Sequence, residues 1–466
     1  MSDAQERSHA NQPPTDARIQ PLVERVRGAA HPLTGDWSDF DSLMKLIDDA
    51  RYVLIGEASH GTHEFYRMRA LITRRLIVEQ GFSAICVEAD WPDAYRINRY
   101  VRGEGGAETS LDALAGFVRF PTWMWRNTVV LDFVGWLRQH NADNNATQRQ
   151  VGFYGLDLYS LYASIDAVLR YLEQVDPEVA ARARERYACF ENFGRDAQTY
   201  GLLSGYAQRD SCEDAVIQQL TDMRNHALDY ARRDGLLAED EFFYADQNAQ
   251  VIKNAEEYYR SMYHGRNNTW NLRDRHMADT LDALVTHLDR TRGEPTKVVV
   301  WAHNSHLGDA RATEMGHNGE LNLGQLMRER HGDQTRLIGQ TTYTGTVTAA
   351  DDWDEPAQRK RVRQGMIGSY EMLFHLVGAP NFLLPLRDEA DALAGLYEPR
   401  MERAIGVIYK PETERYSHYF YAQLPNQFDA VLHLDETRAL EPLERTSHWG
   451  GETEHEEAPE TYPSAL

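Results

Sequence analysis

The chain has 466 residues, of which 42% are hydrophobic, and its formal net charge is −23. This length and apolar content are sufficient for one or two globular domains with a sizeable core. The negative charge argues against nucleic acid or an anionic membrane as a partner, because such a surface repels phosphate groups.

The chain contains three cysteines, Cys86, Cys189 and Cys212, and no Cys-x-x-Cys pair. This odd and scattered set predicts neither a disulfide framework nor a cysteine zinc site. The N-terminal segment is polar and lacks an apolar signal core, and the longest apolar runs are too short to span a bilayer. We therefore expect a soluble cytoplasmic protein, and the sequence contains no signal for its oligomeric state.

Short apolar runs alternate with amphipathic helical stretches along most of the chain. The periodicity predicts three early strands at 52–56, 83–88 and 151–157, with helices at 62–80 and 123–141 between them. The later predicted strands are 297–302, 335–343, 381–386, 405–409 and 429–434. Alternating strands and helices predict an α/β fold with a mostly parallel central sheet flanked by helices.

The stretch 159–291 is almost wholly helical in character and contains few strand signals. We expect it to form a large helical insertion, or cap, on an α/β core built from residues 21–158 and 292–445. Residues 1–20 and the acidic tail at 446–466 are polar, and their composition predicts disorder.

Ionisable side chains occupy one recurrent position, the carboxyl end of a predicted strand. In chain order they are Glu57 and His60, Glu88 and Asp90, Asp157, and His303 and His306. The carboxyl ends of parallel strands meet at one edge of an open sheet, where ligands bind. We therefore expect these groups to gather in one site. The alternative for each is an ordinary turn acid, a helix cap or a hydrogen-bonded turn histidine.

Several common enzyme motifs are absent from the sequence: G-x-S-x-G, H-E-x-x-H, the Walker A loop and G-x-G-x-x-G. What remains is the chemistry of histidine, carboxylate and arginine. A histidine can deprotonate water while a carboxylate orients its ring, and a guanidinium or second imidazole can stabilise an oxyanion. This set suffices for hydrolysis of an ester or lactone, but the same groups can bind Zn²⁺ or Mn²⁺.

Two aromatic-rich segments carry further candidates. In 258–281, Arg273 and Asp274 stand beside Trp270 and are expected to form a wall of the site; the alternative is a surface helix with ion pairs. In “FPTWMWRN”, Trp125 and Arg126 are candidates for lining an apolar substrate pocket, although buried core aromatics beside an extended arginine are the commoner arrangement.

Two motifs resemble signatures of a known family. “GEASHGTHEFYRMR” resembles the G-E-x-x-H-G opening signature of the erythromycin esterase family, and “WAHNSHLG” resembles its H-N-x-H segment. “EADWP”, “YGLDLYS” and “LPNQFDAVLHLDET” are similar to its broader, succinoglycan-biosynthesis-like branch. The resemblance covers roughly residues 20–440, nearly the whole chain.

The resemblance implies metal-independent hydrolysis in which His60 is the general base that activates water and Glu57 is its carboxylate partner. It also marks Arg69, His303 and His306, which we expect to polarise the carbonyl or stabilise the oxyanion. The strand-end acids Glu88, Asp90 and Asp157 are expected to support the site. Macrolide hydrolysis, and with it macrolide resistance, is one activity of the family, but these motifs do not specify the substrate.

We therefore expect a hydrolase that acts on a small-molecule ester or lactone without a cofactor. The first alternative is a metal-dependent hydrolase that holds a divalent metal through Glu57, His60 and His303. The second alternative is a non-catalytic ligand-binding protein on the same scaffold.

Overall fold

The computed structural model describes residues 19–446 and 449, apart from 145–149, 207–210, 228–229, 231–235, 264–265 and 388–392. The predicted disorder of 1–20 and 446–466 therefore falls almost wholly outside the described residues. Gln20 is an exception, because it begins the first helix, α1 (Gln20–Ala29). In the described part of the chain, no helix has the length and apolar content that a membrane span requires.

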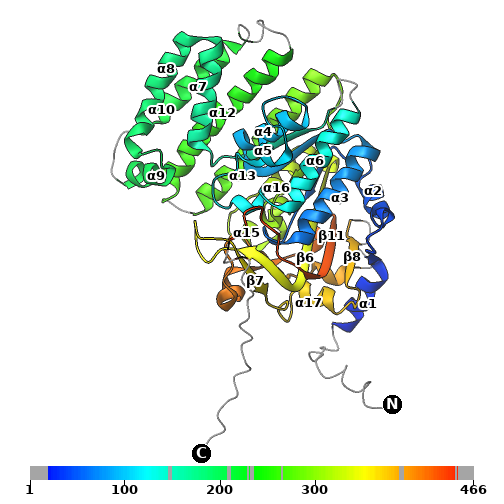
Figure 1. Ribbon diagram of the computed structural model, residues 1–466. Helices are drawn as coiled ribbons and strands as arrows, with labels where there is room; N and C mark the ends of the chain where they lie inside the picture. Colours follow the sequence, from blue (N-terminus) through cyan, green and yellow to red (C-terminus); the bar gives the residue numbers. More distant parts are fainter. Residues whose placement is uncertain are drawn as a thin grey trace, which may run out of the picture.

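A central sheet organises the molecule (Figure 1). Its strand order is β1-β8-β11-β6-β2-β5-β3-β4, with β7 paired to β6. The strands are β1 (His31–Pro32), β2 (Tyr52–Ile55), β3 (Ala84–Asp90), β4 (Gly152–Asp157), β5 (Val298–Trp301), β6 (Thr335–Ala349), β7 (Gln358–Val362), β8 (Asn381–Pro385) and β11 (Ala430–Thr437). All neighbours from β11 to β4 are parallel, whereas β1, β7 and β8 pair antiparallel. The predicted mostly parallel α/β fold is confirmed.

The central strands are buried on both faces, which explains their nearly continuous apolar sequences. Along β2, Val53 and Ile55 belong to one hydrophobic core, while Tyr52 and Leu54 belong to another on the opposite face. This alternation follows from the two-residue period of a strand. The first core is covered by α2 (Asp41–Ile47), α3 (His63–Gln80), α4 (Trp91–Val101), α5 (Ser110–Leu114) and α6 (Thr128–Asp143). The second is covered mainly by α1, α13 (Arg266–Arg292), α16 (Leu323–His331) and α17 (Tyr370–His375).

A helical block lies between β4 and β5 in the chain and occupies one end of the molecule (Figure 1). Besides α13, its helices are α7 (Leu161–Val175), α8 (Pro177–Tyr187), α9 (Ala197–Tyr206), α10 (Glu213–Asn225) and α12 (Leu236–Ser261). Helices α7 to α12 share a hydrophobic core of their own, separate from the two cores beside the sheet.

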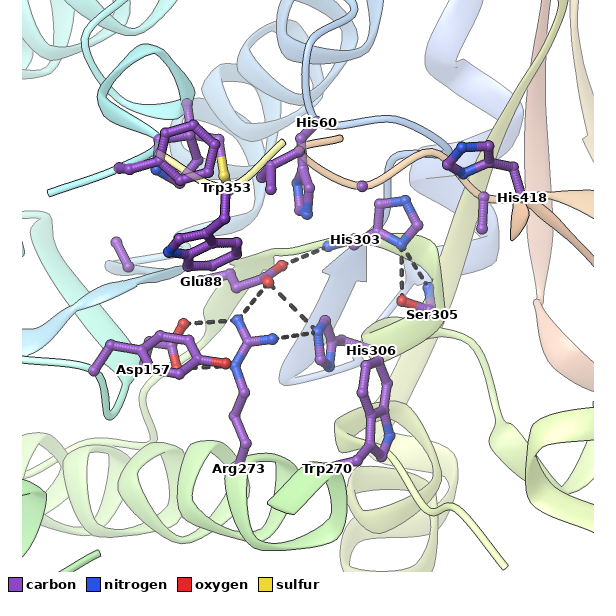
Figure 2. Close-up of a pocket in the computed structure, with 18 of the residues that line it drawn as sticks. His60, Glu88, Asp157, Trp270, Arg273, His303, Ser305, His306, Trp353 and His418 are labelled. Carbon is purple, nitrogen blue, oxygen red and sulfur yellow. Dashed lines mark hydrogen bonds and ion pairs between the residues drawn. The ribbon is translucent and has the colours of Figure 1, made fainter. Parts of the chain in front are cut away.

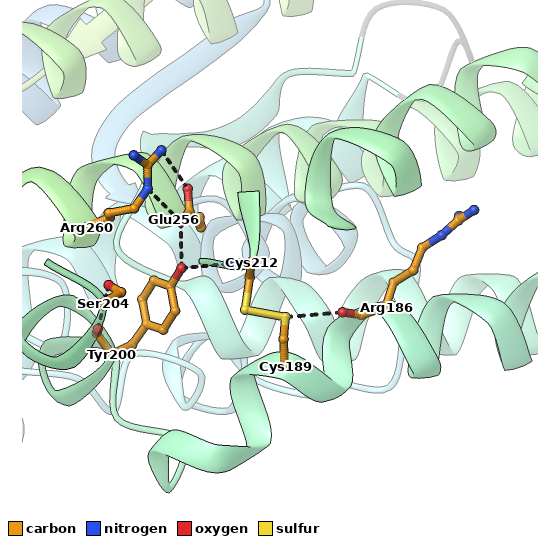
Figure 3. Close-up of a disulfide and its surroundings, with 7 residues drawn as sticks. All are labelled: Arg186, Cys189, Tyr200, Ser204, Cys212, Glu256 and Arg260. Carbon is orange, nitrogen blue, oxygen red and sulfur yellow. Dashed lines mark hydrogen bonds and ion pairs between the residues drawn. A yellow bond between two sulfur atoms is a disulfide. The ribbon is translucent and has the colours of Figure 1, made fainter. Parts of the chain in front are cut away.

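A disulfide joins Cys189 to Cys212 within this block, so the prediction that disulfides would not contribute to the framework is wrong (Figure 3). The two residues flank α9, and the helical packing brings their Cα atoms to 6.0 Å. Tertiary packing brings the two cysteines together, and their spacing in the sequence does not indicate it. Cys86 is free and buried in β3.

Two local predictions also differ from the structure. The expected strand at 405–409 is absent, and Ile405 and Ile408 form only isolated bridges. The nearby strands are instead β9 (Arg400–Arg403) and β10 (Tyr419–Ala422), which pair as a separate ribbon. The expected helix at 123–141 is interrupted: a 3₁₀ turn covers Thr122–Met124, and α6 begins only at Thr128. Asn127 causes this start, because its side chain caps the helix by accepting from the Val130 N–H.

The remaining short helices lie in the connections after β5, between β9 and β10, and before β11. They are α14 (Asn304–Leu307), α15 (Glu314–His317), α18 (Glu414–Ser417) and α19 (Leu424–Gln427). Helix α14 directly follows β5, so the “HNSH” motif lies at the carboxyl end of a central strand.

Candidate active site

A cavity of about 550 Å³ lies at the carboxyl ends of the central parallel strands. This volume is within the range of pockets that bury small-molecule ligands. Predicted site residues from four strands and from α13 line it together: His60, Glu88, Asp90, Asp157, Arg273, His303 and His306 (Figure 2). The four strands, β2, β5, β3 and β4, are parallel neighbours, and this topology is what brings the groups to one edge.

The loop after β2 holds His60 in one tautomer. Its Nδ1 lies 3.0 Å from Oε1 of Glu57, and the other Glu57 oxygen lies 2.8 Å from Nη2 of Arg69. A carboxylate only accepts hydrogen bonds, so Nδ1 carries a proton, and in the neutral form of the ring the lone pair is on Nε2. Arg69 is fully buried under Tyr66 and Trp301, and it lies behind Glu57 rather than in the cavity wall.

Glycines give this loop its close contacts. A Cβ on Gly56 would lie 2.2 Å from Oδ1 of Asn304, and a Cβ on Gly61 would lie 1.8 Å from the Thr348 carbonyl oxygen. The Asn304 N–H also donates to the Glu57 carbonyl oxygen at 2.8 Å. The loops after β2 and β5 therefore interlock at their backbones, and only a residue without a side chain fits at position 56.

His303 is held as the complementary tautomer. The Ser305 N–H donates to its Nδ1 at 3.2 Å, so Nδ1 is the unprotonated nitrogen and the proton of the neutral ring is on Nε2. Burial and the neighbouring His60 lower the pKa of His303 to about 3, which keeps the ring neutral at physiological pH. Within the described residues, His303 Nε2 has no hydrogen-bond partner. The His60 and His303 rings are 4.8 Å apart between centroids.

His306 is fixed on several sides. Its Nδ1 lies 2.9 Å from both Asp274 oxygens, and its ring stacks on Trp270 at 4.5 Å. Its Nε2 lies 3.0 Å from Arg273 Nη1 and 3.4 Å from Glu88 Oε1. Burial lowers the pKa of His306, but Asp274 and Glu88 outweigh this effect and raise it above its usual value.

A buried charge network joins α13 to the ends of β3 and β4. Arg273 donates to Glu88 at 2.6 Å and to both oxygens of Asp157 at 2.7 and 3.0 Å, and it lies over the Tyr159 ring. Glu88 also accepts from the His303 N–H at 2.9 Å. Burial raises the pKa of Glu88, but His306, Arg273 and His60 together hold it well below its usual range. Glu88 therefore remains ionised and ties the loop after β5 to α13.

The other predicted residues lie in different places. Asp90 accepts from Arg119 at 2.9 Å in the cavity wall, and Trp125 lines the same cavity. Arg126 instead pairs with Glu444 and does not line the cavity. Asp274 is fully buried behind His306.

Several cavity residues were not identified from the sequence: Arg119, Tyr159, Ser305, Trp353 and His418. Ser305 and Tyr159 lie within the predicted motifs, beside the candidate residues His303 and Asp157. Nothing in the local sequence distinguishes Arg119, Trp353 or His418 from surface residues, because distant segments bring them to the cavity.

The donor set bears on metal binding. Among the described residues, no three His, Cys, Asp or Glu side chains are grouped so that they could hold one metal ion. Glu57, His60 and His303 do not form such a group, and both Glu57 oxygens are engaged, by His60 and Arg69.

Comparisons with known proteins give a family model and several relatives. The family model described as erythromycin esterase matches residues 77–437. The chain is 23% identical over 439 residues to erythromycin esterase type II of Escherichia coli, covering 88% of this chain and 95% of that protein. It is 20% identical over 420 residues to the putative hydrolase YbfO of Bacillus subtilis, covering 85% and 86% respectively.

Solved structures share the fold. A succinoglycan biosynthesis protein superposes with a TM-score of 0.71 at 22% identity, covering 91% of this chain and 98% of that one. An erythromycin esterase mutant in its open conformation superposes with a TM-score of 0.63 at 19% identity, covering 89% and 96%.

Proposed function

Because the chain belongs to the erythromycin esterase family, we propose that it hydrolyses a carboxylic ester or lactone with water activated by His60. One observation carries the proposal: two neighbouring imidazoles hold opposite tautomers. His60 has its lone pair on Nε2, while the neutral His303 has its proton on Nε2. A base and a hydrogen-bond donor thus stand side by side, as attack of water on a carbonyl requires.

In the proposed reaction, His60 Nε2 accepts a proton from water while the water oxygen attacks the carbonyl carbon. The carbonyl oxygen becomes an oxyanion, which accepts a hydrogen bond from His303 Nε2–H. The tetrahedral intermediate then collapses, the bond to the alcohol oxygen breaks, and the His60 imidazolium returns its proton to that oxygen. The products are a carboxylic acid and an alcohol, or a hydroxy acid from a lactone.

Glu57 and Arg69 act on His60 rather than on the substrate. The Glu57 carboxylate holds the ring orientation and stabilises the imidazolium that forms, and Arg69 compensates the buried charge of Glu57. This role differs from the expectation that Arg69 would polarise the carbonyl. His306, paired with Asp274 and close to Glu88, supports the position of the loop after β5.

The test uses chelator-treated, metal-free protein and a panel of esters and lactones. The panel includes erythromycin because one relative is named an erythromycin esterase. We expect His60→Asn to lower turnover by about 10²–10⁴-fold, the usual worth of a general base. The matched control is His63→Asn, three positions further on: His63 accepts from Arg438 at 2.7 Å and does not line the cavity.

The outcomes distinguish the metal-independent hydrolase from the metal-dependent hydrolase and from the binding protein. Near-normal turnover by His60→Asn would remove His60 as the base. Turnover that requires an added divalent metal would support Glu57, His60 and His303 as metal ligands. Ligand binding without turnover of any panel member by the wild-type protein would support a non-catalytic binding protein.

A further inference from the structure

The cavity has two unlike sides. The side formed by the strand ends carries the histidines and the charge network. The other side is apolar, and two segments form it: the chain before α6 and the connection between β6 and β7. These segments contribute Phe117, Phe120, Pro121, Met124, Trp125 and Trp353. Trp353 is labelled in Figure 2.

The inner part of this apolar wall is fixed by the core. Phe117, Met124 and Trp125 are only 5–6% exposed and belong to the hydrophobic core between the sheet and α6. The Asn127 side chain donates to the carbonyl oxygens of Trp123 and Met124 at 3.1 and 2.9 Å, which sets the 3₁₀ turn. The wall is therefore preformed rather than assembled around a ligand.

The outer part of the wall is exposed. Trp353 is 47% exposed, and its ring lies 5.1 Å from that of Phe120, which reaches the cavity from the other segment. Tyr416, at the cavity rim, is 86% exposed. Large apolar rings held at the mouth of a pocket gain by being covered, because covering them removes apolar surface from water.

The charge of the cavity limits what covers these rings. Among the described residues, six acids line the cavity, and burial raises the pKa of one of them, Asp93, to about 7. The cationic groups of the lining are Arg119 and Arg273, both already paired with carboxylates, and His306, whose pKa is raised. The acids therefore outnumber the cationic groups. An anionic group entering the cavity would meet net repulsion.

We infer that Trp353 and Phe120 form the binding surface for an uncharged apolar group attached to the scissile carbonyl. The substrate class is thus an ester or lactone with a sizeable apolar side and no negative charge. This inference rests on the proposed hydrolase function. It assigns Trp353 as a specificity-determining residue that takes no part in the chemical step.

The test compares p-nitrophenyl esters that share one leaving group. The acyl chain grows from acetyl to octanoyl, and one further ester carries a terminal carboxylate on a chain of similar length. In the wild-type protein we expect kcat/KM to rise by at least about tenfold along the alkyl series and to fall for the carboxylate ester. Trp353→Ala should remove most of that rise, measured within the variant as the ratio of kcat/KM for the octanoyl ester to kcat/KM for the acetyl ester, and Trp353→Phe should retain it.

The control is Trp37→Ala, because Trp37 is a comparably exposed tryptophan, at 46%, outside the cavity. This variant should keep the full dependence on chain length. Turnover with no dependence on acyl length, or an unchanged dependence in Trp353→Ala, would overturn the inference.

A second measurement separates this inference from the proposed function. Calorimetry with alkyl amides of the same chain lengths, which contain no ester, measures binding without turnover. If the wild-type protein cleaves no ester, the hydrolase proposal fails. Amide affinity that rises with chain length in the wild type and not in Trp353→Ala would then still support the apolar binding surface. Affinity independent of chain length would overturn it.

Discussion

The loops after β2 and β5 and the helix α13 supply ionisable side chains to the same site, but these regions hold their side chains differently. In the loops the two backbones lie close together: the Asn304 N–H donates to the Glu57 carbonyl oxygen, and Gly56 leaves room for the Asn304 side chain. Helix α13 reaches the site only with side chains, principally Arg273 and Asp274.

Helix α13 also differs from the rest of the helical block in the hydrophobic core on which it packs. It packs on the second core beside the sheet, which it shares with Ala302 and Leu307 of the loop after β5, whereas helices α7 to α12 pack around a separate core. The comparison indicates a division of roles. The sheet edge sets the geometry of the two imidazoles, and the helical block contributes compensating charge from outside. Each of the following experiments perturbs one region and asks whether the other responds.

The largest expected effect comes from removing the buried arginines. Arg69→Met leaves Glu57 without its cation, and Arg273→Met leaves Glu88 and Asp157 buried without theirs. We expect each variant to lower the free energy of unfolding by about 3–5 kcal/mol, measured by denaturant titration. Arg195→Met is the control, because the Arg195–Asp166 pair is exposed and should contribute less than about 1 kcal/mol.

Hydrogen exchange on the same variants separates the regions. Arg273→Met should accelerate exchange in α13 and leave α3 protected, whereas Arg69→Met should do the opposite. Equal acceleration of both helices in both variants would contradict the division of roles.

The disulfide gives the next largest effect, confined to the helical block. Cys189 and Cys212 are 23 residues apart, and a loop of that size predicts about 3 kcal/mol of stabilisation from the cross-link. Reductant should therefore lower the melting temperature of the wild-type protein and have no further effect on Cys189→Ser. Thiol titration after denaturation should find one thiol in the oxidised protein, since Cys86 is free. Three thiols without reductant would show that the bond does not form.

The smallest effect is a pH dependence of stability. Burial, aided by His60, lowers the pKa of His303 to about 3, and burial lowers the pKa of His276 in α13 to about 4, both from a usual value of 6.5. Below pH 6.5 the unfolded chain binds protons that these folded rings do not, so stability is lost as pH falls toward the folded pKa values. Each group contributes a slope of up to about 1.4 kcal/mol per pH unit.

Denaturant titrations between pH 7 and pH 5 should show a shallower slope in His303→Asn and in His276→Asn than in the wild type. The first variant reports on the sheet edge and the second on the helical block. Slopes identical to the wild type in both variants would contradict the assignment of neutral buried rings.

The sequence predicted which side chains the strand topology brings together at the cavity. Glu57, Glu88, Asp157 and His303 lie at or near the carboxyl end of a buried strand, and parallel pairing brings such positions to one edge. The parts of the site that depend on tertiary packing could not be predicted from the local sequence. Arg126 is next to Trp125 in the sequence, but its side chain pairs with Glu444 and does not line the cavity.

The same limit explains the other differences. The Cys189–Cys212 bond depends on how helices fold back on one another, and Trp353 reaches the cavity from a connection far along the chain. The apolar run at 405–409 lacks a neighbouring strand with which to pair, so strand-like composition produced only isolated bridges there. A local sequence pattern indicates the secondary structure that a segment prefers. Which other segment it pairs or packs with depends on the whole fold.

The interlock between Gly56 and Asn304 has a consequence for how such a sequence diverges. A methyl group at position 56 would collide with the Asn304 amide, and that amide also donates to the Gln340 carbonyl oxygen at 2.8 Å. Position 56 therefore cannot change alone: a larger residue there requires a smaller one at 304, which would abandon the hydrogen bond to β6. We expect glycine to be retained at position 56 wherever asparagine is retained at position 304.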